Sequence, residues 1–498
     1  MLTIGVALVL FVLNSVNSQT INEIKLTASD GLPGDEFGIA VATTSDHTII
    51  GSPGDAFRPA GVYIFSRSGQ DWLQQTRLTA SAGSDGDRFG QAVALDGDYA
   101  IVGANEDEIA GNFRQGSAYI FKRDGANWTV QVKLTASDGQ AFAFFGFSVA
   151  INGKYAAVGA YHADDGKGAV YVFKRDNANW VEQAKLSASD GKEGDLFGVS
   201  VAIAGDRLIA GAYTDLSAGI QAGSAYIFTR EGDVWIQEVK LLASDGVMND
   251  HFGWSVAING DRVLVGTPQT GGSGSGNGSA YVFKFDGTNW IEEGKLAPGD
   301  GVSGGEFAYS VCLAGDFALI GARSDNVMSD GSGSAYLFQR DNSVWTQVAK
   351  LTASNGGADH FFGGSVSIAG DQAVVGAFNS EDNGGGPQGS AYVYTGFSTV
   401  VAVEEQLSNN PAQFRLEQNY PNPFNPSTTI QFSLPEKSLV SLRIFNISGQ
   451  EVISLVSEKL TAGQYQIDWD ASGQASGVYY YQLQTEEFLQ TKKLLLLK

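Results

Sequence analysis

The chain is poor in the residues that most often carry redox, metal and nucleophilic chemistry. Its 498 residues include one cysteine, Cys312, and four histidines, His47, His162, His251 and His360. A single cysteine excludes an intramolecular disulfide, and Cys312 lies in an expected strand, where a small buried hydrophobic residue is the better interpretation than a reactive thiol. No two histidines have the spacing of metal ligands, and no Ser/His/Asp or Cys/His arrangement can be assembled. We therefore expect no catalytic residue, no bound metal and no cofactor.

Basic residues are also scarce. Lys and Arg together number 31 against 54 Asp and Glu, which gives a formal net charge of −23 at pH 7. Nucleic acids and anionic membrane surfaces attract basic faces, so this balance argues against either partner. Outside the N-terminus no stretch is apolar enough to cross a membrane, and we expect no transmembrane segment in the mature chain. An acidic exterior favours solubility and is compatible with divalent ions or cationic ligands.

One sequence pattern recurs seven times, in steps of 52 to 56 residues. The typical copy runs from Lys-Leu through an acidic Gly-rich stretch, Phe-Gly, Val-Gly-Ala and Gly-Ser-Ala-Tyr-Ile-Phe to a Trp. The basic residues that start the copies are Lys25, Arg77, Lys133, Lys185, Lys240, Lys295 and Lys350. Only the interval between the Val-Gly-Ala glycine and the Gly-Ser-Ala glycine varies freely, from 9 to 13 residues. Such a fixed period indicates one supersecondary unit stacked many times, with a single variable loop in each copy.

Each copy has the pattern of a four-stranded antiparallel meander. In the second copy the expected strands are residues 89–95, 99–103, 117–122 and 128–134, with tight-turn signals such as Asp96-Gly97 between them. Seven meanders bury both of their faces when they are arranged radially, so the pattern predicts an all-β fold with a seven-bladed β-propeller. The seventh copy ends after Tyr394 and lacks its Trp strand, whereas residues 20–26 align with that strand. We expect the N-terminal strand to complete the last blade and close the ring.

The repeats resemble the bacterial FG-GAP type, which is related to the seven-bladed head of integrin α chains. The resemblance covers about residues 20–396 and is carried by Phe89-Gly90 with Val102-Gly103-Ala104, by Phe197-Gly198 with Gly211-Ala212, and by their counterparts. Many relatives bind calcium in an Asp-x-Asp-x-Asp-Gly loop between the first two strands. Here that connection is a short turn such as residues 95–99, which cannot supply six to eight oxygen ligands. Calcium binding is therefore not carried over.

The two ends of the chain differ from the repeats. Residues 1–18 have the short apolar core and small residues of a secretory signal peptide. The propeller is expected over 19–396, a linker over 397–413, and a last domain over 414–498. That domain, with Asn419-Tyr420-Pro421, Gly477-Val478-Tyr479 and a terminal run of lysines and leucines, resembles the C-terminal sorting domain of type IX secretion in bacteria of the Bacteroidetes kind. The resemblance implies a small Ig-like β-sandwich, recognised by the type IX export machinery and usually cleaved on export.

Two sets of residues are candidates for a site. The first set is acidic and lies in the segments between blades; its members are Asp30, Asp138, Asp190, Asp245 and Asp300, and Asp35, Asp87, Asp195 and Asp250. These carboxylates would either bind cations as a ring or, as we favour, shape the turns by accepting backbone N–H bonds. The second set lies in the variable loops, which are expected to share one face with those segments. Its members are Phe57, Arg58, Glu106, Phe113, Arg114, Tyr161, His162, Tyr213, Arg323 and Phe378.

Diverse loops on a rigid scaffold are where recognition usually resides, although ordinary solvated loops would have the same pattern. We expect a non-enzymatic recognition or adhesion protein, secreted or attached to the outer cell surface, whose loop face binds an extracellular protein or glycan. One alternative is a secreted polysaccharide-degrading enzyme, which would need two carboxylates about 5 to 9.5 Å apart. Another alternative is a purely structural component of a surface layer.

Overall fold

The computed structural model divides into two compact units, Met1–Ala402 and Val403–Lys498, and each is described by itself. The structure describes residues 21–54, 60–80, 86–217, 220–268, 277–300, 304–327, 329, 331–381, 386–397, 414–416, 419, 422, 424–435, 437–460, 463–471, 473–485 and 488–497. The expected signal peptide and residues 398–413 of the expected linker lie outside this part of the chain.

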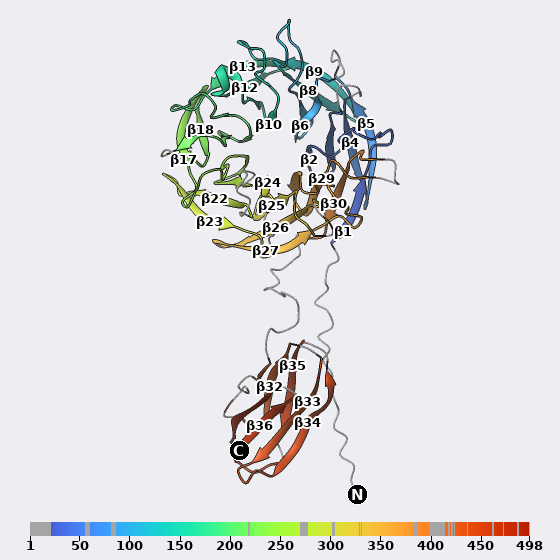
Figure 1. Ribbon diagram of the computed structural model, residues 1–498, viewed down its shortest axis with the longest axis vertical. Coiled ribbons are helices and arrows are strands. Elements are labelled where there is room, and N and C mark those ends of the chain that lie inside the picture. Colours follow the sequence, from blue (N-terminus) through green and yellow to red (C-terminus); the bar gives the residue numbers. More distant parts are fainter. Residues whose placement is uncertain are drawn as a thin grey trace. The chain divides into compact units, whose positions relative to one another are not determined.

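The first unit is a ring of seven four-stranded antiparallel sheets (Figure 1). From the axis outward, the blades are β2 (Val41–Thr43), β3 (His47–Ser52), β4 (Gly61–Ser68), β5 (Asp71–Leu78); β6 (Phe89–Asp96), β7 (Tyr99–Ala104), β8 (Ser117–Asp124), β9 (Asn127–Leu134); β10 (Ser148–Asn152), β11 (Tyr155–Ala160), β12 (Ala169–Asp176), β13 (Asn179–Leu186); β14 (Val201–Ala204), β15 (Arg207–Ala212), β18 (Ser224–Glu231), β19 (Val234–Leu241); β20 (Ser255–Asn259), β21 (Arg262–Thr267), β22 (Ser279–Phe285), β23 (Trp290–Leu296); β24 (Phe307–Ala314), β25 (Phe317–Ala322), β26 (Ser334–Asp341), β27 (Val344–Leu351); and β28 (Ser365–Ala369), β29 (Gln372–Ala377), β30 (Ser390–Thr395), β1 (Asn22–Leu26). These sheets confirm the seven-bladed propeller.

The ring is closed by the N-terminal strand. β1 pairs antiparallel with β30, so that Asn22 lies opposite Thr395 and Leu26 opposite Ala391. The Glu23 carboxylate accepts hydrogen bonds from the Ser354 hydroxyl (2.6 Å) and the Tyr394 hydroxyl (3.0 Å). The first strand therefore supplies both backbone pairing and side-chain contacts to the last blade, which confirms the expected closure.

The seventh blade replaces its missing tryptophan with a phenylalanine. In the third blade Trp180 packs edge-on against Tyr99 of the second blade, with ring centroids 6.1 Å apart. The corresponding partner in the sixth blade is Phe317, and Phe397 packs against it at 5.6 Å. Phe397 is fully buried, although the sequence places it first in the linker. The packing of the propeller therefore extends one residue further than expected.

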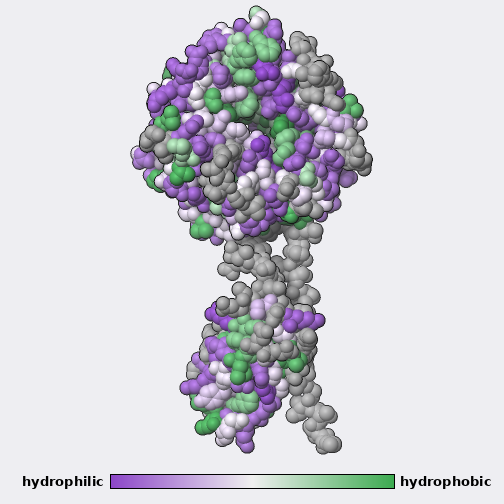
Figure 2. Space-filling view, in the orientation of Figure 1, coloured by the Kyte–Doolittle hydropathy of each residue, from purple (hydrophilic) through white to green (hydrophobic). Residues whose placement is uncertain are grey.

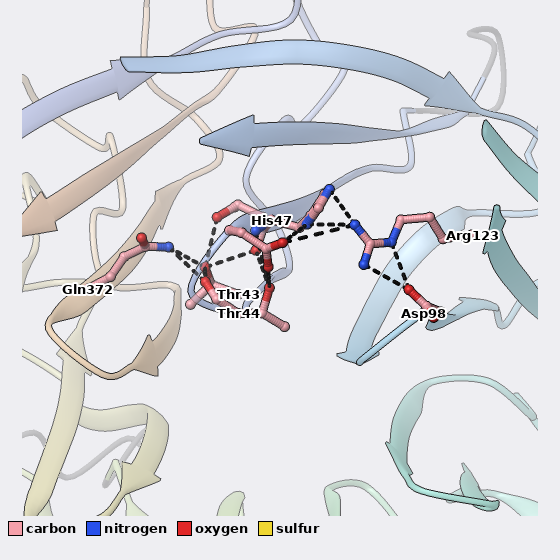
Figure 3. A network of polar contacts seen from close by, with 8 residues as sticks. Thr43, Thr44, His47, Asp98, Arg123 and Gln372 are labelled. Carbon is pink, nitrogen blue, oxygen red and sulfur yellow. Dashed lines mark hydrogen bonds and ion pairs between the residues drawn. The ribbon is translucent and has the colours of Figure 1, made fainter. Parts of the chain in front are cut away.

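Polar contacts join the seventh, first and second blades at the turns between the two inner strands (Figure 3). The buried Gln372 side chain donates to the Thr43 hydroxyl (2.6 Å) and to the Thr44 carbonyl (3.2 Å). On the other side, Arg123 lies 3.1 Å from Nε2 of His47 and donates to Asp98 (2.7 Å). Side chains thus link the seventh blade to the first, and the first to the second, in addition to the shared core.

Two loops carry short elements that the repeat does not predict. The loop of the third blade contains α1 (Ala163–Gly166), and the loop of the fourth blade contains the small hairpin of β16 (Leu216–Ser217) and β17 (Ile220–Gln221). On the propeller face drawn in Figure 2, hydrophilic residues predominate and hydrophobic residues form small separate groups.

The hydrophobic core lies between the blades and repeats around the ring. The phenylalanine of each Phe-Gly step is almost completely buried and meets the tyrosine of the Ala-Tyr step edge-on, as Phe145 and Tyr171 do at 5.4 Å. The Val-Gly-Ala glycine lets neighbouring blades approach closely. A Cβ atom on Gly103 would lie 1.9 Å from the carbonyl oxygen of Gly146 in the next blade, so only glycine fits there.

The second unit is a two-sheet β structure. One sheet has the order β31 (Arg415–Leu416), β32 (Ser427–Leu434), β35 (Gly463–Asp470), and the other β34 (Glu451–Leu460), β33 (Ser438–Asn446), β36 (Gly477–Gln484), β37 (Leu489–Leu496). Ile430 and Trp469 from the first sheet share a core with Leu442, Tyr481 and Leu494 from the second. Two sheets packed over one core are compatible with the expected Ig-like sandwich.

Candidate functional site

The variable loops and the segments between blades meet on one face of the propeller, which we call the loop face. Because the strands of a blade are antiparallel, the loop after the second strand ends on the same side as the segment that leads to the next blade. Backbone hydrogen bonds hold the two together. The Phe142 N–H donates to the Phe113 carbonyl (2.9 Å), and the Leu196 N–H donates to the Gly166 carbonyl (3.0 Å). The side chains of neighbouring blades are therefore held in a fixed relation on this face.

Each blade begins with a residue in the left-handed backbone conformation, directly before the buried phenylalanine. Its φ is between 53° and 61° in all seven blades, and the residues are Glu36, Arg88, Phe144, Leu196, His251, Glu306 and Phe361. This conformation costs about 1 kcal/mol or more for a residue other than glycine, and such strain concentrates at functional sites. The backbone is the same in every blade, whereas the side chain differs between neighbours. The scaffold thus presents acidic, basic, aromatic, aliphatic and imidazole side chains on one ring, with no two adjacent blades alike.

Aromatic side chains extend along the loop face from the third blade to the seventh. Trp254 contacts Tyr213 of the preceding blade (ring centroids 4.9 Å apart) and Tyr309 of the following blade (5.3 Å). The Arg323 guanidinium lies 3.7 Å from the centre of the Tyr309 ring and 5.9 Å from that of Phe361. These residues belong to a set that we call the aromatic arc: Phe144, Phe147, Tyr161, Tyr213, Trp254, Tyr309, Arg323, Phe361 and Phe378. All of them are partly exposed.

Stacked rings form the two ends of the arc. In the third blade Tyr161 lies parallel to Phe144 (5.3 Å) and edge-on to Phe147 (4.6 Å). In the seventh blade Phe361 and Phe378 are stacked at 5.3 Å. Because each ring is packed against another, these side chains have little freedom to move and present fixed apolar surfaces to solvent.

Three arginines on the loop face, one of them the arc member Arg323, are paired with carboxylates. Arg88 pairs with Glu36 (2.7 Å), Arg114 with Glu106 (3.1 Å), and Arg323 with Glu306 (2.5 Å). Two of these glutamates occupy the strained position, so the same ring supplies aromatic groups in some blades and carboxylates in others. The arc therefore combines apolar rings with paired charges.

The tyrosine hydroxyls of the arc are neutral groups. Burial raises the pKa of Tyr161, and the neighbouring Tyr213 raises it further. Burial also raises the pKa of Tyr213 and of Tyr309. The Tyr161 and Tyr213 hydroxyls have no hydrogen-bond partner among the described residues. Both hydroxyls can therefore donate a hydrogen bond to a ligand.

The structure places the loop candidates as follows. Tyr161, Tyr213, Arg323 and Phe378 belong to the arc, and the exposed His162 lies beside Phe144, with ring centroids 6.3 Å apart. Phe57 and Arg58 lie outside the described residues.

The other three loop candidates form a group next to the third-blade end of the arc. The Arg114 guanidinium pairs with Glu106 and lies 5.1 Å from the centre of the Phe113 ring. Phe113 in turn packs edge-on against Phe142 at 5.5 Å. Eight of the ten candidates thus lie in or beside the arc.

Sequence reasoning missed the members of the arc that flank the Phe-Gly steps. Phe144 and Phe361 directly precede the buried phenylalanine, while Phe147, Trp254 and Tyr309 follow it by two positions. The available signal was the fixed spacing of these positions combined with their varied residue types. The variable loop lengths do not indicate these residues, because the segments that contain them have the same length in every copy.

Five of the acidic candidates make ion pairs with the basic residue that starts the next repeat; they are Asp30, Asp138, Asp190, Asp245 and Asp300. Lys185 donates to Asp138 (2.7 Å), and the Tyr171 hydroxyl donates to the same carboxylate (2.6 Å). Four further pairs have the same form: Arg77 with Asp30, Lys240 with Asp190, Lys295 with Asp245, and Lys350 with Asp300. The repeat-starting basic residue thus binds the aspartate of the preceding segment.

The other four acidic candidates, Asp35, Asp87, Asp195 and Asp250, are buried beneath the loop face. Asp35, Asp195 and Asp250 each accept a backbone N–H three residues earlier in the chain, at 2.6 to 2.7 Å, as the turn-shaping interpretation requires. Within the described ranges, no group of three or more His, Cys, Asp or Glu residues is placed to hold a metal ion.

Three further buried aspartates were not expected. Asp107, Asp215 and Asp325 lie four residues after the Val-Gly-Ala glycine of their blades. Each accepts from the serine of Gly-Ser-Ala-Tyr and from the repeat-starting lysine; Lys133 lies 2.7 Å from Asp107 and Lys240 2.5 Å from Asp215. Their equal distance from the preceding glycine could have identified them from the sequence. The different lengths of the loops that follow them obscured this regularity.

A closed ring of β-meanders built on Phe-Gly and Val-Gly-Ala steps defines a seven-bladed repeat propeller. The chain belongs to the FG-GAP repeat family, whose model matches it at residues 21–65, 72–121, 128–173, 180–228, 235–283, 290–338 and 345–394. Residues 418–497 match the secretion system C-terminal sorting domain. This domain directs a protein to type IX secretion, so the protein is exported and is secreted or held at the cell surface.

One similar solved structure is that of PorZ, described as an essential bacterial surface component of the type IX secretion system of Porphyromonas gingivalis. The TM-score is 0.44 and the sequence identity 13%, over 95% of this chain and 61% of that one. The chain thus spans about three fifths of the length of PorZ. No curated protein matches the sequence. In the described part of the chain, no helix has the length and apolar character needed to cross a bilayer.

Proposed function

We propose that the protein is a non-enzymatic recognition or adhesion protein, acting at the cell surface or in the medium, and that its aromatic arc binds an extracellular protein or glycan. The observation that carries the proposal is the ring of strained positions with its varied side chains. A ring that served only the fold would be expected to repeat its side chains as faithfully as its backbone. The sorting domain supplies the location in which such binding would occur.

The surroundings of the buried carboxylates support a non-enzymatic role. Asp195 and Asp215 interact with each other, and burial together with Asp215 raises the pKa of Asp195. A raised pKa would suit a general acid. However, both side chains are about 3% exposed, and both are engaged by groups of the scaffold, the Lys192 N–H for Asp195 and Lys240 for Asp215. A polysaccharide could not reach this pair without rearrangement of the loop face.

Binding and turnover should be measured together. The labelled full chain is applied to arrays of extracellular proteins and of glycans, and the same preparation is assayed for release of reducing ends from soluble polysaccharides. We expect saturable binding without turnover, weakened about tenfold or more by Trp254→Ala. The matched control is Trp290→Ala on the outer strand β23, which should bind like the unmodified chain.

Three results would contradict the proposal. Release of reducing ends would favour the enzymatic alternative, and an absence of binding on both arrays would favour a purely structural role. Equal binding by the Trp254→Ala and unmodified chains would show that the ligand does not bind at the arc.

A further inference from the structure

The chemistry of the arc also points to a class of ligand. We propose that the aromatic arc binds a neutral oligosaccharide, with aromatic rings against the C–H faces of the sugars and fixed polar groups toward their hydroxyls. This inference rests on the proposed function and narrows it. It is carried by three features of the arc: its charge balance, its free hydroxyl groups and its length.

The charge balance favours an uncharged ligand. The chain as a whole has a net charge of −23, which would attract cations. At the arc, however, Arg323 has a glutamate at 2.5 Å, and Arg114, beside the third-blade end, has one at 3.1 Å. A polyanion would have to compete with these glutamates for the guanidinium groups. A cation would have to compete with the arginines for the carboxylates. A neutral ligand meets neither cost, and a hydroxyl group can bond to a paired carboxylate or guanidinium without separating the pair.

The polar atoms of the arc are arranged like those of a site for hydroxyl groups. The Arg323 guanidinium is held by Glu306, whose Oε2 also accepts the Ser324 hydroxyl at 2.8 Å. The phenol groups of Tyr161 and Tyr213 have no partner within the described ranges and stand at the edges of packed rings. An apolar surface with a few fixed polar groups is the usual composition of a specific small-molecule site. Sugars match it, because one face of the ring carries C–H groups and the edge carries hydroxyls.

The extent of the arc favours several sugar units over one. Trp254 bridges the fourth, fifth and sixth blades through Tyr213 and Tyr309, and Arg323 extends the series to Phe361 in the seventh. A ligand of one ring could touch only a part of this series. A chain of repeating units could place successive rings on successive blades, and each contact would add to the affinity.

The test uses the full chain and immobilised polysaccharides in surface plasmon resonance. The neutral probes are dextran, mannan and laminarin, and the charged probes are alginate and chitosan, each at 50 and 500 mM NaCl. We expect saturable binding to at least one neutral probe with less than about a twofold change between the two salt concentrations, since neutral ligands are not screened. Trp254→Ala and Tyr213→Ala should each weaken it about tenfold or more.

Two variants separate loss of stacking from loss of folding. Trp254→Phe keeps an aromatic surface and should retain more affinity than Trp254→Ala, whereas Trp290→Ala removes a tryptophan outside the arc and should bind normally. If Trp254→Ala and Trp254→Phe lose the same affinity, or if Trp290→Ala loses as much, stacking in the arc is not responsible.

The remaining outcomes distinguish this inference from the broader proposal. Salt-sensitive binding to alginate or chitosan alone would overturn the neutral ligand. If no neutral probe binds but arc variants lose binding of a protein found on the arrays, recognition by the arc is supported and the neutral oligosaccharide is ruled out as its ligand. If arc variants lose no binding of any kind, both are wrong.

Discussion

At the scale of single residues, Lys350 shows how this propeller joins its blades. Its ammonium group lies 2.8 Å from Asp300, whose side chain is 56% exposed, and 3.0 Å from Asp325, whose side chain is 3% exposed. Asp325 also accepts from the hydroxyls of Ser334 (2.6 Å) and Tyr336 (2.8 Å). The two carboxylates share one cation but differ in their access to water. They therefore offer a matched comparison of a buried and an exposed partner.

Asp325→Ala should lower the free energy of unfolding by about 2 kcal/mol or more, because it leaves two buried hydroxyls without their acceptor and Lys350 without its buried partner. Asp300→Ala should cost less than about 1 kcal/mol, since exposed ion pairs contribute little. Urea unfolding followed by tryptophan fluorescence compares the two variants. Equal costs would show that the burial of Asp325 does not matter.

The contribution of Asp325 should depend on pH. Burial by itself would raise the pKa of this carboxyl, but the hydrogen bonds from Ser334, Lys350 and Tyr336 outweigh it and hold the pKa below its ordinary value of 3.8. A group whose pKa is lowered by folding stabilises the protein fully above its unfolded pKa and loses this effect as the pH falls through its folded pKa. The stability difference between the unmodified chain and Asp325→Ala should be constant from pH 5 to 7 and shrink below about pH 4. A difference that grows on acidification would contradict this assignment.

The residue types of the repeat predicted the hydrophobic core between the blades better than they predicted the candidate site on the loop face. Phe-Gly and Ala-Tyr steps identified the buried rings, because their spacing is the same in all copies. The pairing of Lys185 with Asp138 could not be read from the sequence, since the two residues belong to successive copies and meet only after one blade is rotated against the next. For the same reason, loop candidates such as Tyr213 were found without the neighbour, Trp254, that fixes the ring in place.

At the scale of strands and loops, the sequence repeat predicts the strands that all seven blades have in common. The segments expected at 89–95, 99–103, 117–122 and 128–134 correspond to β6, β7, β8 and β9, with bounds that differ by at most two residues. The short elements α1, β16 and β17 have no counterpart in the other blades, and a repeat pattern contains no information about them. Recognition of the missing seventh Trp strand was sufficient to predict the partner of β1.

Removal of the N-terminal strand should open the ring. Deleting residues 19–27 removes β1 and exposes the unpaired edge of β30, and exposed edges pair with other chains. We expect dimers or larger aggregates in size-exclusion chromatography with light scattering, and a lower melting temperature. Addition of a peptide covering residues 19–27 should restore the monomer in part. A truncated chain that stays monomeric and melts like the unmodified chain would show that β1 is dispensable for closure.

At the scale of the whole molecule, the acidic surplus should make stability sensitive to salt. A net charge of −23 disfavours the compact state through repulsion between like charges, and salt screens this repulsion. The melting temperature of the full chain should rise by about 2 °C or more between 20 and 200 mM NaCl. The lysine–aspartate pairs between blades act in the opposite direction, so a fall in melting temperature would mean that these pairs outweigh the general repulsion.

The pairing of β1 with β30 also sets an order of events for a newly made chain. Leu26 is synthesised early, yet its partner Ala391 emerges from the ribosome about 20 to 70 s later at ordinary elongation rates. During that interval β1 has no strand to pair with, because β30 has not yet been synthesised. Any factor that binds the nascent polypeptide before export must therefore shield β1. The ring closes only when β30, the last propeller strand to be synthesised, pairs with β1, the first.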